Sequence, residues 1–252
     1  TMHAACTPYA DRFITPMAAV AGAVADRVLA AMTKHRRLSK AFVNNGGDIA
    51  FHLTSGTSLR CALVTDISVG ATAGLVPATH DLRRRPAAKS PPAEPLSINT
   101  EQDGAGRISP DGTFLLTAAH PARGLATSGR ACKGHGGRSF SFGIADSVTV
   151  LARTAARADA AATIIGNAVD LPGDPAIDRR PASDIDPASD LGDRLITFDV
   201  GHLTTDAIDT ALDAGETMAD TLLRDGLIEG AVLALHGRLR IRHQSLALQE
   251  PT

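Results

Sequence analysis

Two oxygen-bearing side chains, Asp159 and Thr163, lie four residues apart in a segment otherwise rich in Ala and Ile. In a helix this spacing places both side chains on one face, about one turn apart. A carboxylate and a hydroxyl are hard oxygen ligands, which suit Mg²⁺ because that ion takes one or two protein oxygens and keeps other positions for water and phosphate. The spacing alone favours a simpler interpretation, namely a polar stripe facing solvent or a threonine hydrogen-bonded to its own helix.

A second segment that could bind a ligand is the turn formed by Asn45, Gly46, Gly47 and Asp48. Glycines permit positive φ and let the backbone approach a ligand closely, and successive N–H groups in such a turn can bind an anion. The Asp48 carboxylate could accept a hydrogen bond from a ribose or a base. The alternative is a plain hairpin turn, because Asn-Gly between apolar runs is a strong hairpin signal.

A third segment, residues 124–138, combines hydroxyls, glycines and cations. It contains Thr127, Ser128, Gly129, Arg130, Lys133 and Arg138. These groups suit a diphosphate, although the order of a P-loop and of a dinucleotide-binding GxGxxG are both absent. A surface loop remains the alternative interpretation. No GxSxG or HExxH pattern occurs, so the common hydrolases that use those motifs are not indicated.

The composition of the chain indicates which kinds of binding partner and which cellular compartment to expect. The formal net charge is −2 and aromatic residues make up 3% of the chain, so neither a basic patch nor stacking platforms for nucleic acid are expected. The three cysteines form no CxxC pair, which is typical of free thiols in a reducing, cytoplasmic setting. No uncharged apolar run reaches 18 residues, so we expect no membrane span and no membrane partner.

The elements that must position these segments follow from hydrophobic periodicity and turn residues. Helices are predicted over residues 15–32, 154–169 and 204–224. Strands are predicted over 41–44, 48–53, 59–65, 113–117, 125–127, one or two within 139–152, 195–200, 230–235 and 238–241, with a connection over 171–193 and a frayed tail from 242. Because hairpins cluster with helices between them, we expect an α+β fold with a mainly antiparallel sheet covered by helices. The chain is interpreted as a single domain, 1–252, with a low-complexity insertion at about 66–112.

Three short motifs, taken in order, carry a resemblance to a known family. They are VNNGGDIA (43–50), GLATSG (124–129) and SVTV (147–150) followed by RADAAAT (157–163). Together they resemble the ApbE-like superfamily and, within it, a shorter uncharacterised branch of bacteria and archaea. The similarity runs over about residues 15–235, with 66–119 poorly covered.

The resemblance implies Mg²⁺-dependent transfer of FMN from FAD to a Thr or Ser of a target flavoprotein, with release of AMP. It implies FAD and Mg²⁺ as cofactors, a flavin nucleotide and an acceptor flavoprotein as partners, and leaves a homo-oligomer open. The implied metal ligands are Asp159, Thr163 and the backbone of Val20. The implied FAD-binding residues are Asn45, Gly46, Gly47, Asp48, Thr127, Ser128, Gly129 and Arg130.

The chain also departs from the transferases of this family. Their Ser-His-x-x-Asp-Pro-Arg-Thr-Gly stretch corresponds to residues 141–146, where only Asp146 survives, so Asp146 is the one catalytic residue that the resemblance implies. Their small-residue helix usually holds a Lys where this chain has Ala21. A non-catalytic protein that binds a nucleotide, flavin or pterin on the same fold is therefore the alternative function.

Overall fold

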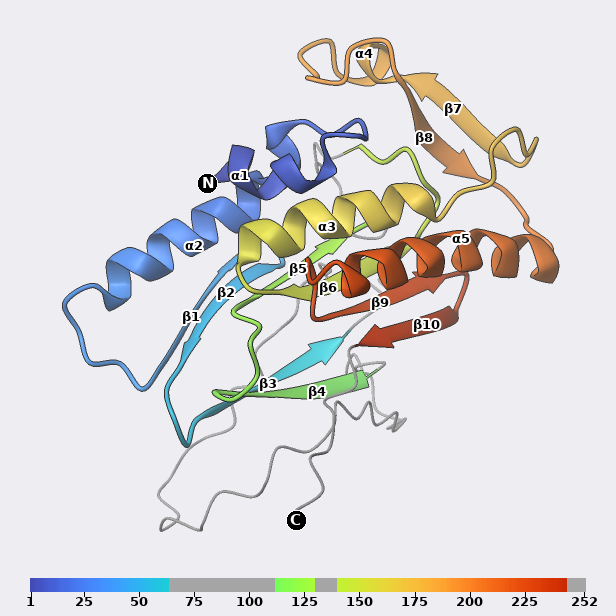
Figure 1. Cartoon of the computed structure of the whole chain (residues 1–252). Coiled ribbons are helices and arrows are strands. Elements are labelled where there is room, and N and C mark those ends of the chain that lie inside the picture. Colours follow the sequence, from blue (N-terminus) through green and yellow to red (C-terminus); the bar gives the residue numbers. More distant parts are fainter. Residues whose placement is uncertain (64–111, 130–139, 244–252) are drawn as a thin grey trace, which may run out of the picture.

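A six-stranded antiparallel sheet organises the chain, as seen in the computed structural model, which describes residues 1–63, 112–129 and 140–243 (Figure 1). Its strand order is β1-β2-β5-β6-β9-β10, from β1 (Lys40–Asn45), β2 (Asp48–Leu53), β5 (Gly124–Ser128), β6 (Ser147–Ala152), β9 (Gly230–Leu235) and β10 (Arg238–His243). Two small antiparallel pairs join β3 (Ser58–Leu63) to β4 (Gly112–Thr117) and β7 (Ile177–Pro181) to β8 (Leu195–Val200). The predicted α+β class with a mainly antiparallel sheet is therefore confirmed.

Three long helices lie over one face of this sheet (Figure 1). They are α2 (Val20–Thr33), α3 (Ala155–Ala168) and α5 (Thr205–Arg224). Short helices α1 (Met2–Cys6) and α4 (Ala182–Ile185), with 3₁₀ turns at Thr7–Tyr9 and Pro16–Ala19, complete the described helical structure. Helix α3 sits between the other two and packs on β5 and β6, and nine of its residues, mostly Ala and Ile, are buried.

The sheet is buried on both faces, which explains why its central strands show no clean alternation of polar and apolar residues. On the helix side, Val148 and Val150 of β6 pack with Ile165 and Leu233. On the other side, Leu151 packs with a second core that includes Ile49, Phe51, Leu116 and Leu125, closed by the β3–β4 pair. All six residues of β6 and of β9 are buried in consequence.

The structure corrects several predicted boundaries. The predicted connection over 171–193 contains β7 and α4, which are polar and hold few buried residues, so periodicity did not indicate them. Only β6 forms within 139–152 in the described part, and β10 continues to His243 rather than fraying from 242. The first helix begins with a 3₁₀ turn, so α2 itself starts at Val20. Nearly all of the expected insertion at about 66–112 lies outside the described residues.

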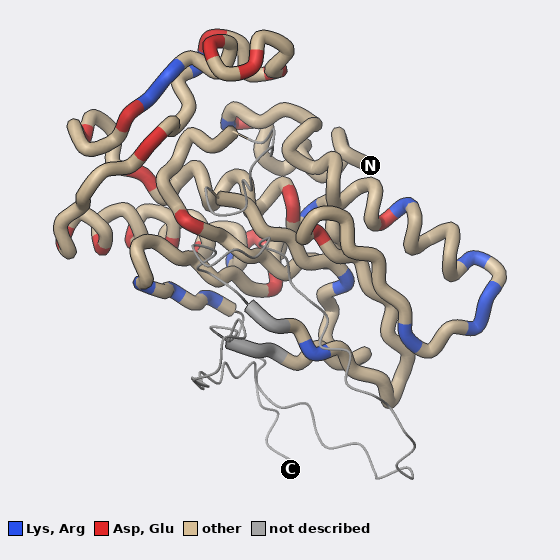
Figure 2. The backbone as a smooth tube through the Cα atoms, turned by 180° about the vertical axis from the view of Figure 1, so that it is seen from behind, with Lys and Arg blue, Asp and Glu red and all other residues tan. Residues whose placement is uncertain are grey.

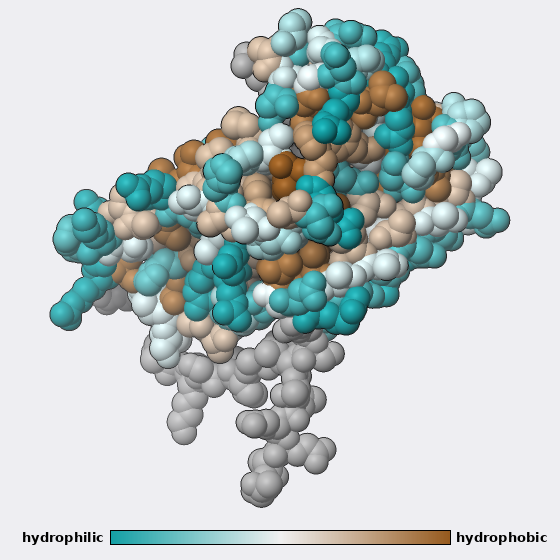
Figure 3. All heavy atoms as spheres, turned by 45° about the horizontal axis from the view of Figure 1, so that its top comes forward, coloured by the Kyte–Doolittle hydropathy of each residue, from teal (hydrophilic) through white to brown (hydrophobic). Residues whose placement is uncertain are grey.

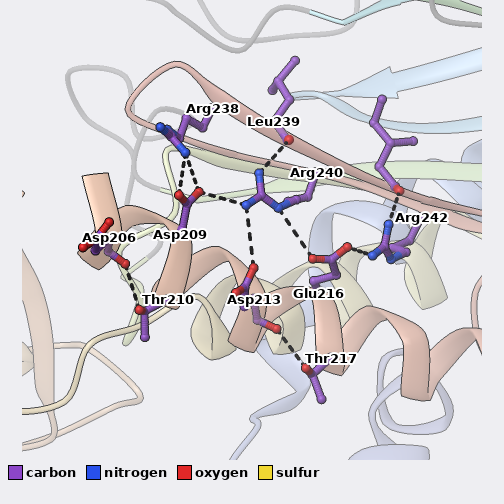
Figure 4. Close-up of polar contacts among 11 residues, drawn as sticks. Asp206, Asp209, Thr210, Asp213, Glu216, Thr217, Arg238, Leu239, Arg240 and Arg242 are labelled. Carbon is purple, nitrogen blue, oxygen red and sulfur yellow. Dashed lines mark hydrogen bonds and ion pairs between the residues drawn. The ribbon is translucent and has the colours of Figure 1, made fainter. Parts of the chain in front are cut away.

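An ion-pair ladder holds the edge strand β10 against α5 (Figure 4). The acidic side chains lie on one face of α5 and the arginines alternate along β10, as the periods of helix and strand require. The members are Asp209, Asp213, Glu216, Asp220, Arg238, Arg240 and Arg242. Arg240 is shared most widely, with its guanidinium 2.9 Å from Asp209 Oδ1, 3.7 Å from Asp213 and 3.6 Å from Glu216. The two nearest arginines lower the pKa of Asp209 through hydrogen bonds.

We expect Arg240→Gln to lower Tm by roughly 2–4 °C at low salt, because it removes a cation that several carboxylates share. The loss should shrink in about 1 M NaCl, where such charges are screened. Thermal melts at both salt concentrations measure it. Arg12→Gln is the matched control, since Arg12 forms an exposed ion pair with Asp11 at 3.8 Å and lies outside the ladder. Equal losses for the two variants would show that the ladder adds nothing beyond isolated surface pairs.

Candidate functional site

Five elements, α2 included, meet at the amino end of α2 and bring most of the predicted site residues together. The Gly22 amide of α2 donates to Asp159 Oδ2 of α3 at 3.0 Å. The Thr127 amide of β5 donates to Asp48 Oδ1 of β2 at 3.2 Å. The Asn45 side-chain amide, at the end of β1, donates to the Ala21 carbonyl at 3.0 Å. Residues more than a hundred positions apart in the chain thus form one polar cluster under the helices.

Helices α2 and α3 cap each other through carboxylates. Asp159 of α3 accepts hydrogen bonds from the Gly22 and Ala21 amides at the start of α2. Asp26 of α2 in turn accepts from the Ala155 and Ala156 amides at the start of α3, each at 3.0 Å. The first amides of a helix lack intrahelical partners, and a carboxylate there is also favoured by the helix dipole. The sequence analysis missed Asp26, because a lone Asp in an Ala-rich helix gives no signal of a partner far away in the chain.

Asp48 is buried and Asp159 is half-buried, and their carboxyl groups lie close enough for each to influence the pKa of the other. Burial raises the pKa of Asp159 to about 6, although the Gly22 and Ala21 amides oppose the rise. Burial, and then the neighbouring Asp159 carboxylate, raise the pKa of Asp48 well above its usual range. Two carboxylates this close are stable only with a proton or a cation between them.

The carboxyl pair predicts a stability that falls as pH rises. A carboxyl whose folded pKa lies above its unfolded value stabilises the fold fully below about pH 4 and loses that contribution as pH passes through the folded value. For Asp159 the window runs from about pH 4 to about 6, and the loss is about 3 kcal/mol. Urea denaturation between pH 4 and 8 without divalent cations measures it.

Asp48→Asn is the comparison for the pH experiment. The amide oxygen still accepts from Thr127, while the Asp48 carboxyl, whose own raised pKa adds to the pH dependence, is gone. The slope of unfolding free energy against pH should therefore be clearly flatter than in the parent protein. An unchanged slope would mean that the pair does not titrate as one unit.

The donor set at this site fits Mg²⁺ by its chemistry. It offers two carboxylates, and the half-buried Thr163 hydroxyl lies one helical turn from Asp159. Nowhere in residues 1–63, 112–129 and 140–243 do three or more His, Cys, Asp or Glu side chains gather as a metal cage. A site with few carboxylates is what Mg²⁺ uses when water and substrate phosphates complete its coordination, unlike a structural zinc site.

The Gly-Gly turn has free space beside Gly46, but the Gly47 amide is already used in a hydrogen bond within the turn. Gly46 and Gly47 have φ of 68° and 109°, so both need the left-handed freedom that glycine provides. A Cβ added at Gly46 would meet no atom within 4 Å. The Gly47 amide already donates to the Asn44 side chain at 2.8 Å, so it contributes to the turn rather than to an anion.

The other predicted residues lie along β5 and at its end. The Thr127 hydroxyl is 2.9 Å from the Thr149 hydroxyl on β6. Ser128 faces α3 near Gly166. Gly129 has φ of 133°, and a Cβ there would lie 2.7 Å from the Asp146 carbonyl, so only glycine fits. Arg130 lies outside the described residues. Val20 opens α2, directly before the two amides that cap Asp159.

Asp146, predicted as catalytic, has a structural partner. Its Oδ2 accepts a hydrogen bond from the His236 amide at 2.6 Å. His236 has φ of 47° in the β9–β10 turn, a conformation that non-glycine residues rarely adopt. The Asp146 carboxylate therefore stabilises a strained turn, and it is not part of the Asp48–Asp159 pair.

The amino-terminal segment adds a thiol that the sequence analysis did not single out. Cys6 ends α1 and is buried, and its thiol donates to the Thr15 carbonyl at 3.5 Å. Burial, and then the Asp159 carboxylate, raise the pKa of Cys6. The segment therefore packs close to the carboxyl pair, as the position of α1 beside the start of α2 also indicates (Figure 1).

Comparisons with known proteins give a family and distant relatives. A family model described as "AbpE bacteria" matches residues 1–241. A UPF0280 protein of Methanococcus vannielii is 35% identical over 154 residues, which is 61% of this chain and 45% of that protein. A UPF0280 protein of Methanospirillum hungatei is 33% identical over 168 residues, 66% of this chain and 50% of that protein. The chain thus spans about half the length of these relatives.

Proposed function

The chain belongs to the AbpE bacteria family, an ApbE-like group, and from this premise we propose that it binds FAD with Mg²⁺ and transfers FMN to a Thr or Ser of an acceptor flavoprotein. The observation that carries the proposal is the carboxyl pair of buried Asp48 and half-buried Asp159 at the amino end of α2. A pair of like charges in a buried position is costly unless a ligand uses it. Mg²⁺ bridged to a diphosphate is a ligand that would use it.

The proposed reaction is a phosphoryl transfer. The acceptor hydroxyl oxygen attacks the phosphorus of the FMN half, a new P–O ester bond forms, and the bond from that phosphorus to the bridging oxygen breaks. AMP leaves with the electron pair of that bond, and the hydroxyl proton is released. When bound, Mg²⁺ would supply charge neutralisation on the diphosphate.

The chain's own residues would position the nucleotide. Asp159 and Thr163 would hold the metal, with Val20 contributing its carbonyl, and the α2 amides fix the orientation of Asp159. Asn45 ties the Gly-Gly turn to α2 through the Ala21 carbonyl, which keeps the turn beside the metal position. Thr127, Ser128 and Gly129 at the end of β5 would lie along the diphosphate.

A second candidate is favoured by the surroundings of Asp146. Its carboxylate is engaged by the His236 amide, and the chain lacks the His and Lys of the transferases. A protein with this site could bind a flavin, another nucleotide or a pterin without transferring anything. This candidate predicts ligand binding with no release of AMP.

Titration of FAD into the purified protein, with and without Mg²⁺, tests both candidates in one tube. Flavin fluorescence reports binding and chromatography reports AMP. Saturable, Mg²⁺-dependent binding with AMP release supports the transferase chemistry. Binding without AMP, in the presence of several flavoprotein acceptors, supports the second candidate. Absence of binding in both conditions would reject FAD as the ligand.

A further inference from the structure

Helix α2 carries an apolar row on its outward face. Its inward face contains Gly22, Ala25 and Asp26, which contact α3 or the sheet. Val24 and Val28, on the opposite side of the helix, are 47% and 44% exposed. Met32 and Met17 continue the row at 39% and 53% exposure. A surface helix normally turns polar residues to solvent, so a row of large apolar side chains there indicates an interaction site.

The same region is basic, in contrast to the whole chain. Residues 27–40 contain five Lys and Arg and no Asp or Glu, whereas the complete chain has a net charge of −2. All five cations are exposed: Arg27, Lys34, Arg36, Arg37 and Lys40. The acid that precedes this run, Asp26, is bound to the α3 amides and does not balance them. Figure 2 shows the blue segments gathered at the end of α2 and in the loop that leads to β1.

The apolar row and the cations adjoin each other. The row runs along α2 while most of the cations lie from the last turn of α2 to the start of β1. Figure 3 shows the corresponding end of the molecule in teal, with brown and tan residues on the surface next to it. An apolar helix face joined to a cationic end is the pattern of a helix that lies in the interface of an anionic bilayer.

We propose that α2 docks this protein on an anionic lipid surface, with the Val24–Val28 row at the acyl boundary and the cations against the headgroups. The segment Pro16–Thr33 is long and apolar enough to cross a membrane by length and composition. Spanning the membrane would, however, break the hydrogen bonds of Asp26 to its two amides. It would also separate Gly22 from the α3 backbone, which lies so close that a Cβ added at Gly22 would be 2.3 Å from the Ala155 oxygen. The helix therefore lies on the lipid surface rather than spanning it.

This proposal differs from the absence of a membrane partner expected from the sequence alone. That expectation considered only a spanning segment, whereas the exposed face of α2 becomes visible only in the fold. A second copy of the chain fits the row less well. A parallel pairing of two α2 helices would bring the Lys34–Arg37 cations near their copies, and an antiparallel pairing centred on Val24 and Val28 would bring Arg27 near its copy, without exposed acids of α2 to balance them.

Co-sedimentation with vesicles tests the proposal. We expect the full chain to bind vesicles of phosphatidylcholine with about 30% phosphatidylglycerol at low salt, and to bind pure phosphatidylcholine at least tenfold more weakly. Binding should also weaken as NaCl rises. Equal binding to both lipids, or binding to neither, would overturn the proposal.

Two variants and two controls assign the effect to α2. The double variant Val24→Ser/Val28→Ser removes the centre of the apolar row, and the double variant Arg36→Gln/Arg37→Gln removes two cations. Each double variant should lower the partition coefficient of the protein onto the anionic vesicles roughly tenfold or more. Leu195→Ser, at a residue 55% exposed on β8, and Arg60→Gln, on β3, should leave binding unchanged. Circular dichroism melts verify that every variant folds. If sedimentation velocity instead finds a dimer that the Val24→Ser/Val28→Ser variant dissociates, a second copy covers the row and the proposal is wrong.

Discussion

Asp159→Asn is expected to lower Mg²⁺-dependent AMP release from FAD by roughly 10²–10³-fold, a loss typical of removing one electrostatic contact to a transferring group. The amide oxygen is a weaker metal ligand than the carboxylate and carries no charge to hold Mg²⁺. Mg²⁺ affinity, measured by calorimetry with the metal alone, should fall in parallel. The effect on the fold should be smaller, because an Asn side chain still caps a helix.

Asp26→Asn is the matched control for this prediction. Asp26 and Asp159 perform the same structural task, each accepting two amides at the start of the other's helix. Their difference is that Asp159 is coupled to Asp48, whereas the hydrogen bonds of the Asp26 carboxylate in the described part of the chain go to the α3 amides. Both variants should keep the fold, and only Asp159→Asn should lose Mg²⁺ binding.

Comparing Asp26→Asn with Asp159→Asn separates the structural role of these carboxylates from a role in binding Mg²⁺. If both variants lose Mg²⁺ binding equally, the carboxylates matter only because they hold α2 against α3. If neither does, the metal does not bind at Asp159, and the proposed function loses the observation that carries it. Asp159→Ala would be a poorer probe, since it leaves the Gly22 and Ala21 amides without their acceptor.

Local sequence patterns singled out several residues that the fold places close together, and the reason is physical. Asp48, Asn45, Thr127 and Asp159 were identified separately from such patterns, and the fold brings them together at α2. A Gly-Gly turn and an i, i+4 pair can be seen in the sequence because each leaves a signal within a few residues. The proximity of Asp48 and Asp159 leaves none, because it depends on packing between residues 111 positions apart in the chain.

Elements with few buried side chains were the ones that sequence patterns missed. Strand β7 buries only Ile177 and was missed, whereas its partner β8, which was predicted over residues 195–200, buries Ile196 and Thr197. The role of Asp146 was equally invisible, because its partner is the amide of His236 in a turn 90 positions away. Backbone partners have no side-chain signature.

Gly22→Ala is expected to destabilise the fold by about 3 kcal/mol or more, the upper end of the usual cost of overpacking. A Cβ at this position would lie 2.3 Å from the Ala155 oxygen, 2.4 Å from its carbonyl carbon and 2.7 Å from the Ala156 nitrogen. All three are backbone atoms, so no rotamer change can relieve the contact. The start of α3 would have to move away from α2.

Gly166→Ala is the matched control, because Gly166 also lies inside a long helix, α3. Its added Cβ would meet nothing closer than 3.9 Å, at Ser128 Oγ and Val148 Cγ2. Alanine is favoured over glycine in a helix interior by roughly 0.5–1 kcal/mol, so this variant should be neutral or slightly more stable. Urea denaturation of both variants gives the two free energies, and losses of equal size would show that backbone contact at Gly22 is not the cause.

The Gly22→Ala substitution should also affect the proposed Mg²⁺ site. Separating α2 from α3 stretches the Asp26 bonds at one end of the contact and the Asp159 bond to the Gly22 amide at the other. An Asp159 carboxylate released from that amide would lose its fixed orientation toward Asp48. We therefore expect Gly22→Ala, in protein that is still folded, to bind Mg²⁺ more weakly than the parent, while Gly166→Ala binds it equally well. The close approach that glycine permits is thus a requirement of the site as much as of the fold.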